Sequence, residues 1–569
     1  MSQNNTSDSE AQDHDVRERP IRWLVAPLPA AVLPQGVTPM EPDSVFDRLS
    51  AESDVQLCKR ITPSERLQAL SGDSGFPEVA VLTMTEERAQ ELNRSLEVHV
   101  ERDHRLVYGM PMASPDNIQV LDPAARVPMI GGLTLAFAVR GSDGTPLPRA
   151  EVSLTGAAWP AQGVTGPDGR VVISLSGETP GSIRAVYVRP EHGYWDRWVV
   201  RPQLVPNADN VITLTRLDET VPGFPDRQMF GWGQKAMCLD RIPPTYRAHG
   251  IRIAVIDSGI ATSHPDLEGR VAGGVDVAER KSWSVDVSGH GTHCAGTIAG
   301  ADNGRGIIGS AAEAEIHACK IFPSGRLSDL LEALDYCIEH SIDVVNLSLG
   351  TREHSALVAH KIAAARKLGM ACIAASGNNG GEQILFPGTL DTVLTVAAMG
   401  KTGEGPEDSS HAFQVFGKPT AEGYYSAKFS AYGPGVDLCA PGVAIVSSVP
   451  PANYAAQDGT SMAAPHVTSL AALVLAHHPD FQQRFSGRDE ARVEHLFQIL
   501  RDSCEPLDFG DPRRSGAGLP NAVRALGLDS SVLLGGLMPG AGTTGGFTRT
   551  SAVALVDELE RDLERIGIV

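Results

Sequence analysis

Residues 458–467 read Asp-Gly-Thr-Ser-Met-Ala-Ala-Pro-His-Val, and the rest of the chain is organised around this stretch. Ser461 opens a long apolar pattern that predicts a helix ending near Pro479. At a helix N-terminus, backbone N–H groups converge without partners and the helix dipole favours negative charge. That position suits a nucleophile that must generate an oxyanion beside itself, but serine is also a common helix cap. The stretch alone leaves both interpretations open.

Mostly apolar runs upstream of Ser461 predict the fold of the second half of the chain. Strands buried on both faces are expected at 251–256, 316–321, 342–349, 370–375 and 393–398. Helical patterns lie between them, for example at 328–338 and 355–368. Strands that alternate with helices indicate βαβ units and therefore an α/β fold with a parallel sheet.

Polar residues follow several of these strands, at the sheet edge where functional groups gather in open α/β folds. Asp257 follows the first strand, Ser348 ends the third and Asn378 follows the fourth, while His290 opens the helical segment after Asp257. Each has an ordinary alternative: a strand-end aspartate, a loop asparagine, a helix-start histidine. That all four residues share one sheet edge with Ser461 by chance is much less probable than the ordinary interpretation of any one of them alone.

The chemistry assigns each group a role. A serine hydroxyl needs an adjacent base, which His290 can supply to Ser461. A carboxylate such as Asp257 holds the imidazole in the correct tautomer and stabilises the imidazolium. The Asn378 side-chain amide and the Ser461 backbone N–H qualify as donors to a tetrahedral oxyanion.

Three motifs together resemble the subtilisin-like serine proteases: Asp257-Ser-Gly, His290-Gly-Thr-His and Gly459-Thr-Ser-Met-Ala-Ala-Pro. The order Asp, His, Ser matches that family. The resemblance covers about residues 230–528, and Cys294 is similar to a thiol of the proteinase K branch. It implies a subtilisin-like α/β catalytic domain and an endopeptidase that cleaves protein or peptide substrates through an acyl-enzyme, with no cofactor required for the chemistry.

The same resemblance implies a substrate cleft. Ser348 to Gly350 would pair with the substrate backbone as an added strand. Phe386 falls in the pocket wall for the residue before the scissile bond, and Leu385 stands where the family often has glycine, which favours small substrate side chains. The implied substrate-binding residues are Ser348, Leu349, Gly350, Ser376, Gly377, Leu385 and Phe386.

Asp266 and Asp302 fall where members of the family build a structural calcium site. Carboxylate oxygens suit calcium. Arg305 lies in the same loop, however, and could supply positive charge in place of the ion. The sequence leaves calcium and Arg305 as equal alternatives.

Two further domains are expected before the catalytic one. Residues 21–110 predict a small α+β domain of the split-βαβ kind, and residues 79–100 within it resemble the family's inhibitory propeptide. Residues 130–217 predict a β-sandwich, immunoglobulin-like or carboxypeptidase-regulatory-like, in which nothing indicates catalysis. Because this sandwich intervenes, self-cleavage near residues 109–115 and a permanently attached chaperone or docking domain are both open.

The remaining boundaries are a disordered tail at 1–20, a catalytic domain at 226–528, and a glycine-rich linker with a C-terminal helix at 529–569. The apolar stripe of that helix is expected to dock on the body of the protein, with a partner helix as the alternative.

Composition limits the partners and the compartment. The 569 residues carry 48 Lys and Arg against 69 Asp and Glu, a net charge of −21 that argues against nucleic acid or anionic membrane. No apolar run reaches the length of a membrane span. The N-terminus does not resemble a secretory signal, and eight scattered cysteines indicate buried free thiols, so a cytoplasmic location is expected, with secretion by an unrecognised route as the alternative.

The leading functional hypothesis is an intracellular serine endopeptidase held in check by its own N-terminal domain. A processing protease dedicated to one cytoplasmic substrate is a narrower version of the same chemistry. A catalytically silent peptide-binding scaffold is the alternative from another class.

Overall fold

The structure is a computed structural model that describes residues 20–28, 41–70, 76–95, 97–108, 132–157 and 160–528. Residues up to Leu526 belong to one compact unit. The predicted tail, apart from residue 20, the predicted cleavage region at 109–115 and the C-terminal linker and helix lie outside the described residues.

A nine-stranded sheet forms the centre of the second half of the chain. Its strands, in spatial order, are β13 (Val271–Asp276), β14 (Glu315–Lys320), β12 (Arg252–Asp257), β15 (Val344–Leu347), β16 (Ala371–Ala375), β17 (Leu394–Lys401), β19 (Tyr424–Ala427) and β18 (Val415–Phe416), and β20 (Leu438–Pro441) also pairs with β17. The strands from β13 to β17 are parallel, whereas β18 and β19 form an antiparallel edge. The predicted α/β fold with a parallel sheet is confirmed, with strand boundaries within a few residues of those expected.

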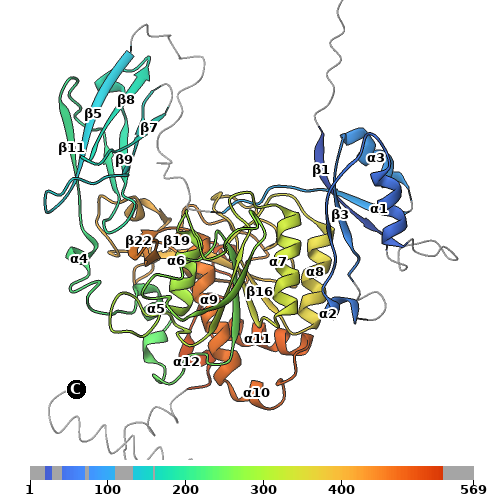
Figure 1. Cartoon of the computed structure of the whole chain (residues 1–569). Helices are drawn as coiled ribbons and strands as arrows, with labels where there is room; N and C mark the ends of the chain where they lie inside the picture. The colour runs from blue at the N-terminus through green and yellow to red at the C-terminus, as the bar shows by residue number, and fades with distance from the viewer. Residues whose placement is uncertain are drawn as a thin grey trace, which may run out of the picture. The chain divides into compact units, whose positions relative to one another are not determined.

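Helices cover the sheet and explain why its central strands are apolar throughout (Figure 1). Helices α6 (His290–Ala299) and α9 (Thr460–His477) pack together, and α7 (Leu327–Glu339) packs beside α8 (Ala356–Lys367). Ser355 caps α8 by accepting a hydrogen bond from the backbone N–H of Val358. None of the described helices combines the length and hydropathy needed to cross a membrane.

The smaller elements of this half connect the main ones. They are α5 (Trp232–Ala236), η5 (Leu239–Arg241), η6 (Ser410–Phe413), β21 (Ile445–Val449), β22 (Asn453–Gln457), α10 (Pro479–Gln482), α11 (Glu490–Asp502), β23 (Cys504–Glu505), η7 (Pro512–Arg514), β24 (Leu519–Pro520) and α12 (Ala522–Ala525).

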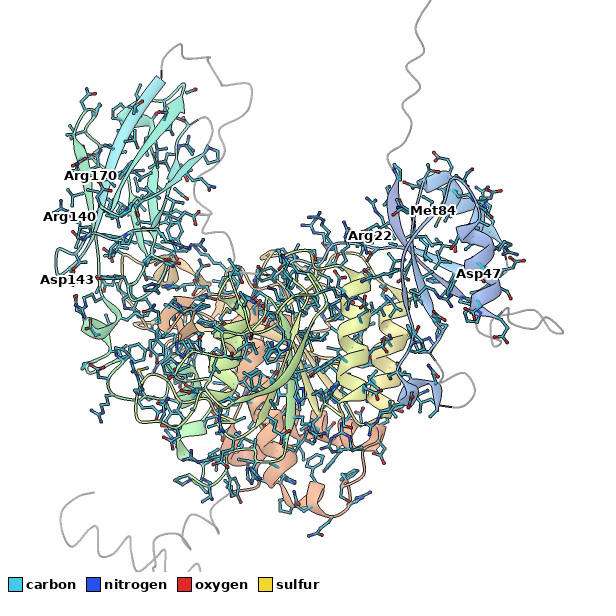
Figure 2. All side chains as sticks on the ribbon, viewed as in Figure 1. Arg22, Asp47, Met84, Arg140, Asp143 and Arg170 are labelled. Carbon is cyan, nitrogen blue, oxygen red and sulfur yellow. The ribbon has the colours of Figure 1, made fainter. Side chains whose placement is uncertain are left out.

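The N-terminal segment, residues 20–108, contains an antiparallel sheet in the order β2-β3-β1-β4. Its elements are β1 (Ile21–Pro27), α1 (Pro42–Ser50), β2 (Gln56–Ile61), α2 (Glu65–Gln68), β3 (Val79–Met84), α3 (Glu86–Arg94) and β4 (Val98–Arg102). The indole of Trp23 on β1 donates to the carbonyl of Met84, the last residue of β3, which is labelled in Figure 2. The sequence did not predict β2 or α2; β2 is an edge strand in which only the last residue is buried, so it lacks an apolar pattern.

The strand-rich segment, residues 132–220, contains two small sheets, ordered β10-β9-β6-β7 and β11-β5-β8. Its elements are β5 (Gly132–Gly141), β6 (Glu151–Thr155), β7 (Ala161–Val164), β8 (Arg170–Ser176), η4 (Pro180–Ser182), β9 (Ala185–Arg189), β10 (Arg197–Val200), β11 (Asp209–Leu214) and α4 (Leu217–Thr220). Side chains from both sheets, such as Phe137 and Val152, share one apolar cluster. Arg140 and Arg170, on the neighbouring strands β5 and β8, are solvent-exposed (Figure 2).

Candidate active site

Asp257 and His290 form a buried pair at the carboxyl end of β12. Asp257 is the last residue of that strand and His290 is the first residue of α6. The imidazole Nδ1 lies 2.8 Å from Asp257 Oδ1 and 2.9 Å from Oδ2. The carboxylate also accepts from the backbone N–H of Ser258 at 2.7 Å, so it is held as an acceptor. This pair has the geometry that fixes a histidine tautomer.

The turn before His290 is held by Asp286, a residue that the sequence motifs did not single out. Its carboxylate accepts from the backbone N–H of Gly289 and Thr292, both at 2.9 Å. The close approach of α6 to the loop after β12 requires glycine at 291, because a Cβ there would lie 2.2 Å from the Gly259 carbonyl oxygen. The turn held by Asp286 and the close approach at Gly291 therefore position the His290 imidazole.

The pKa of His290 is raised above its usual value. Burial by itself lowers this pKa, but the charge of Asp257 and its hydrogen bond outweigh burial. The other ring nitrogen, Nε2, is buried and has no hydrogen-bond partner among the described residues. An unpartnered basic nitrogen beside a carboxylate-bound Nδ1 is what a general base needs.

Ser461 lies in the first turn of α9, as the sequence predicts, and is 3% exposed. Its Oγ donates to the Ser348 carbonyl at 3.3 Å. The Cys294 thiol donates to the Ser461 carbonyl at 3.4 Å, and its sulfur lies within 4.8 Å of polar side-chain atoms of Asp257 and His290. The three predicted residues thus converge, although the serine hydroxyl does not bond the imidazole in this rotamer; catalytic hydrogen bonds often tighten only when substrate binds.

Asn378 is held against the residue preceding Ser461. Its Oδ1 accepts from the Thr460 backbone N–H at 2.9 Å and from the Thr460 hydroxyl at 2.8 Å. Thr460 Oγ1 in turn accepts from the Gly377 backbone N–H at 3.2 Å. These bonds fix which end of the amide is carbonyl and which is donor.

A cavity of about 490 Å³ adjoins Ser461 and collects most of the predicted substrate-binding residues. Those that line it are Ser348, Leu349, Gly350, Gly377 and Leu385, and the predicted oxyanion donor Asn378 lines it as well. Leu385 packs closely on Gly377, where an added Cβ would lie 2.7 Å from the leucine Cγ.

Two predicted cleft residues do not line this cavity. Ser376 is fully buried and its hydroxyl donates to the Ala431 carbonyl. Phe386 is 1% exposed and belongs to the apolar core, while its ring also lies near the exposed His354 and its backbone pairs with Thr351. Side chains alternate along an extended segment, so the side chain of Leu385 reaches the cleft and that of Phe386 does not.

The continuation of β4 occupies part of this cleft, which the sequence did not predict. Val107 exchanges two backbone hydrogen bonds with Gly350, at 2.8 and 2.9 Å, and the Leu106 N–H donates to Gly325 at 2.8 Å. The Tyr108 ring lies edge-on to the His290 ring with centroids 5.0 Å apart. The only available signal was the extended pattern running on from β4, which does not reveal its partner strands.

The predicted calcium residues do not fit a calcium ion. Asp266 accepts from the Tyr454 hydroxyl at 3.0 Å, the Ser448 hydroxyl at 2.9 Å and the Ile307 N–H at 3.4 Å. Asp302 pairs with Arg247 instead. Protein donors therefore already occupy both carboxylates, which form a hydrogen-bond and ion-pair network instead of a calcium cage, with the charge of Arg305 close to Tyr454 of that network.

Comparison with known proteins places this geometry in a family. The subtilase family pattern matches residues 248–518. The chain is similar to Subtilisin Savinase from Lederbergia lenta, with 36% identity over 48% of this chain and 90% of the relative. It is similar to Subtilisin DY from Bacillus licheniformis, with 34% identity over 49% and 92%, and to a thermostable alkaline protease from Halalkalibacterium halodurans, with 32% identity over 49% and 68%.

The prediction of a cytoplasmic location is wrong, because the similarity to these subtilisins and alkaline proteases conflicts with it. The cysteines misled the interpretation. All eight are free thiols, but most are enclosed in the protein core, where burial alone keeps a thiol unpaired in any compartment. The buried ones are Cys294, Cys319, Cys337, Cys372, Cys439 and Cys504.

The family assignment carries a coarse function with it. Serine proteases of this family act on protein or peptide substrates and need no cofactor for catalysis. With identity of 36% over nine-tenths of a relative and the Asp, His, Ser motif order, the chain belongs to the subtilase family and is a subtilisin-like serine endopeptidase.

Proposed function

We propose that Asp257, His290 and Ser461 are the catalytic residues of this endopeptidase. The observation that carries the proposal is the buried pair of Asp257 and His290, 2.8 Å apart, in which His290 Nε2 has no partner among the described residues. Cys294, which lies beside this pair, bonds the Ser461 carbonyl. The proposal requires a rotation of the Ser461 side chain about χ1 that exchanges the Ser348 carbonyl for His290 Nε2.

The reaction follows from these groups. Ser461 Oγ attacks the scissile carbonyl carbon as its proton passes to His290 Nε2, and a C–O bond forms. The C–N bond then breaks, and the leaving amine takes the proton from His290, which leaves an acyl-enzyme. Water, deprotonated by His290, attacks the ester carbon; the C–Oγ bond breaks and Ser461 regains the proton.

Asn378 and the backbone N–H of Ser461 are the proposed oxyanion donors. Because Thr460 engages Asn378 Oδ1 twice, Nδ2 is the end of the amide that acts as a donor. A side-chain amide fixed before substrate arrives needs no reorganisation when charge develops.

The substrate would bind along Ser348 to Gly350, whose backbone already pairs with an extended strand at Val107. Leu385 fills space between Gly350 and Gly377, so we expect a preference for small side chains before the scissile bond. Ser376 and Phe386 would support this wall from behind.

The N-terminal segment is proposed to inhibit the enzyme within the same molecule. Val107 occupies the backbone positions at Gly350 that a substrate would use, and Tyr108 covers His290. A substrate strand and this segment cannot occupy Gly350 together.

Carboxylates of the N-terminal segment contact two helix N-termini of the proposed catalytic part, residues 226–528. Asp103 accepts from the N–H and the hydroxyl of Ser328 at the start of α7, both at 2.9 Å. Glu101 accepts from the Ser355 hydroxyl and, at 2.9 Å, from the Ala356 N–H at the start of α8. Negative charge at a helix N-terminus is stabilising, so the docking geometry uses the ends of both helices.

The proposed domain organisation is a propeptide-like inhibitor at 21–110, a β-sandwich at 130–217 and a catalytic domain at 226–528. It rests on the separate sheets of each region and on the apolar cluster shared by the two sheets of the strand-rich segment. A cut at 109–115 would separate the N-terminal segment, with Val107 and Tyr108, from the rest of the chain. The segment could then dissociate and open the cleft.

The test combines mass spectrometry with a fluorophosphonate probe. The purified chain should acquire a new N-terminus within 109–115, and Ser461 should be labelled faster afterwards. The Ser461→Ala variant should stay uncut and unlabelled. A chain that is neither cut nor labelled, even after limited proteolysis of the N-terminal segment, would instead favour the silent scaffold.

A further inference from the structure

A buried histidine links the strand-rich segment to the loop that carries Ser461. His411 lies in η6, a short turn of the catalytic part, and its Nδ1 is 2.6 Å from Asp458 Oδ1. Its other nitrogen, Nε2, lies 3.7 Å from Asp196 Oδ1. The side chains of these three residues are only 5–6% exposed. Asp458 stands three positions before Ser461, whereas Asp196 belongs to the strand-rich segment.

His411 is positively charged at neutral pH in this setting. Burial lowers its pKa, but the charges of Asp458 and Asp196 and the hydrogen bond to Asp458 outweigh burial and raise the pKa to about 9. The other titratable groups near this trio are Tyr187, which donates to Asp196 at 2.9 Å, and Tyr425, close to Asp458; burial raises the pKa of both above their usual value. The trio is therefore a cation between two carboxylates.

Asp196 is itself fixed by groups on both sides of the contact. It accepts from the backbone N–H of Ser410 at 2.9 Å and from the Ser410 hydroxyl. The neighbouring Trp195 ring lies edge-on to His411 with centroids 5.5 Å apart, and Trp198 N–H donates to the Asp408 carbonyl at 2.7 Å. The carboxylate cannot move away from His411 without breaking this set of bonds.

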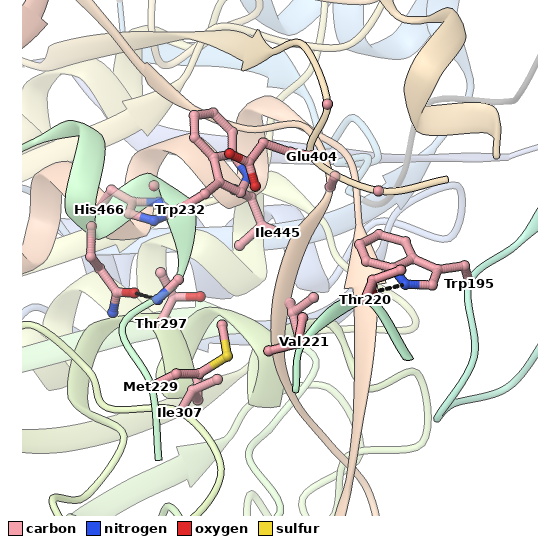
Figure 3. Close-up of a pocket in the computed structure, with 17 residues that line it drawn as sticks. Trp195, Thr220, Val221, Met229, Trp232, Thr297, Ile307, Glu404, Ile445 and His466 are labelled. Atoms are coloured by element: carbon pink, nitrogen blue, oxygen red, sulfur yellow. Dashed lines mark hydrogen bonds between the residues drawn. The ribbon is translucent and has the colours of Figure 1, made fainter. Parts of the chain in front are cut away.

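Trp195 also closes a cavity of about 150 Å³ that reaches the helix of Ser461 (Figure 3). The Trp195 indole donates to the Thr220 hydroxyl at 2.8 Å on one side of this cavity, and His466 of α9 lines it as well. Residues of the strand-rich segment and of the Ser461 helix thus line the same cavity.

The loop from Asp458 to Ser461 is held at successive points. Asp458 Oδ1 accepts from the Ala444 N–H at 2.7 Å as well as from His411. The Gly459 N–H donates to Gly442 at 2.8 Å, and Thr460 is bonded to Asn378. Of these contacts, only that of His411 involves a residue outside the catalytic part, because His411 also faces Asp196 of the strand-rich segment.

We propose that Asp196 is a positioning residue of the active site: through His411 and Asp458 it fixes the loop that presents Ser461, so the strand-rich segment remains a working part of the enzyme after the N-terminal segment is cut away. This inference deepens the proposed function and rests on it. It assigns a role to a segment whose sequence contains no catalytic motif.

The test is the pH dependence of kcat for Asp196→Asn, which keeps the shape of the side chain and removes its charge. We expect kcat to fall about tenfold with KM unchanged, because the substrate cleft is untouched. In the wild type, activity should also decline as pH rises through about 9, where His411 loses its proton. With one carboxylate removed, this alkaline limb should move to lower pH, while the acid limb set by His290 stays in place.

Two further variants keep the result decisive. His411→Gln retains a hydrogen-bond donor for Asp458 and cannot titrate, so the alkaline limb near pH 9 should disappear. If Asp196→Asn fails to fold, His411→Gln tests the proposed role of this contact instead. Asp209→Asn removes an exposed carboxylate from the same segment and should leave kcat and both limbs unchanged.

The outcomes separate the two proposals. A wild type that does not label or turn over after release of the N-terminal segment contradicts the proposed function. An active wild type whose kcat and alkaline limb are matched by Asp196→Asn, or by His411→Gln where the first variant does not fold, overturns the role of Asp196.

Discussion

The N-terminal and strand-rich segments both contact the catalytic part, but with different chemistry. The N-terminal segment presents carboxylates to neutral groups, the N–H and hydroxyl groups that begin α7 and α8. Around them lie ion pairs across the contact that solvent reaches, such as that of Lys59 with Asp329, in which the lysine side chain is 23% exposed. The strand-rich segment instead inserts Asp196 next to a buried imidazolium.

This difference predicts which segment leaves. When the N-terminal segment departs, water can bond the helix ends that it capped, and salt weakens its exposed ion pairs. When Asp196 departs, a buried cation loses one of its two counter-charges, which is strongly destabilising. We therefore expect the contact of the N-terminal segment to be detachable and the contact through Asp196 to be permanent.

The largest test of the comparison is Ser461→Ala. Turnover should fall by on the order of 10⁶, the magnitude measured when the nucleophilic serine is removed from another member of this family. Because the proposed cut is made by the enzyme itself, the variant should also keep its N-terminal segment, and gel mobility with intact mass checks both effects. Cleavage of Ser461→Ala at the wild-type rate would show that another protease removes the segment.

Asn378→Ala should lower kcat by roughly 10²–10³, again the range for a family member, because one of two oxyanion donors is lost. Thr460 would also lose the acceptor that holds it. Asn378→Asp separates the two effects: it keeps an acceptor for Thr460 but supplies no donor, so kcat should stay low while thermal stability recovers. Equal activity in Asn378→Asp and wild type would contradict the oxyanion role.

Asp103→Asn should loosen the detachable contact without touching catalysis. A charged cap contributes about 1–2 kcal/mol, so the initial rate of Ser461 labelling in the uncut chain should rise about tenfold. Asp47→Asn is the matched control, since Asp47 is an exposed carboxylate on α1 of the same segment (Figure 2). After release, both variants should have the wild-type kcat; a lower kcat in Asp103→Asn would mean that the residue does more than dock.

The sequence predicted an inhibitory N-terminal segment and the three catalytic residues, but it did not predict the contact through Asp196. Strand and helix periodicity located Asp257, His290 and Ser461 because each stands at the end of a strongly patterned element. Asp196 and Ser410 are 214 positions apart, and His411 lies in a short turn without periodicity, so no local pattern indicates their contact. The pairing of Val107 with Gly350 was missed for the same reason, since strand patterns do not name their partners.

Other differences arose from side-chain direction and competition for donors. Ser376 and Phe386 occupy the predicted stretch, but their side chains point into the core, a choice set by backbone alternation that the motif alone does not give. Asp266 and Asp302 have the chemistry for calcium, yet hydroxyl groups and Arg247 already satisfy them. A sequence shows which residues could bind a metal ion, but it does not show which protein donors lie next to them in the folded structure.

The smallest expected effect is a shift in the acid limb of activity. The net effect of burial and Asp257 raises the pKa of His290, so its neutral, active form should accumulate only above the usual value of about 6.5. The labelling rate of the released enzyme should therefore have its midpoint above pH 6.5. Removing Tyr108 from the ring lessens the burial that lowers this pKa, so the midpoint of the released enzyme should lie higher than that of the uncut chain. Asp209→Asn in the strand-rich segment should leave both midpoints unchanged, and a midpoint at or below pH 6.5 in the released enzyme would mean that Asp257 does not dominate His290 in solution.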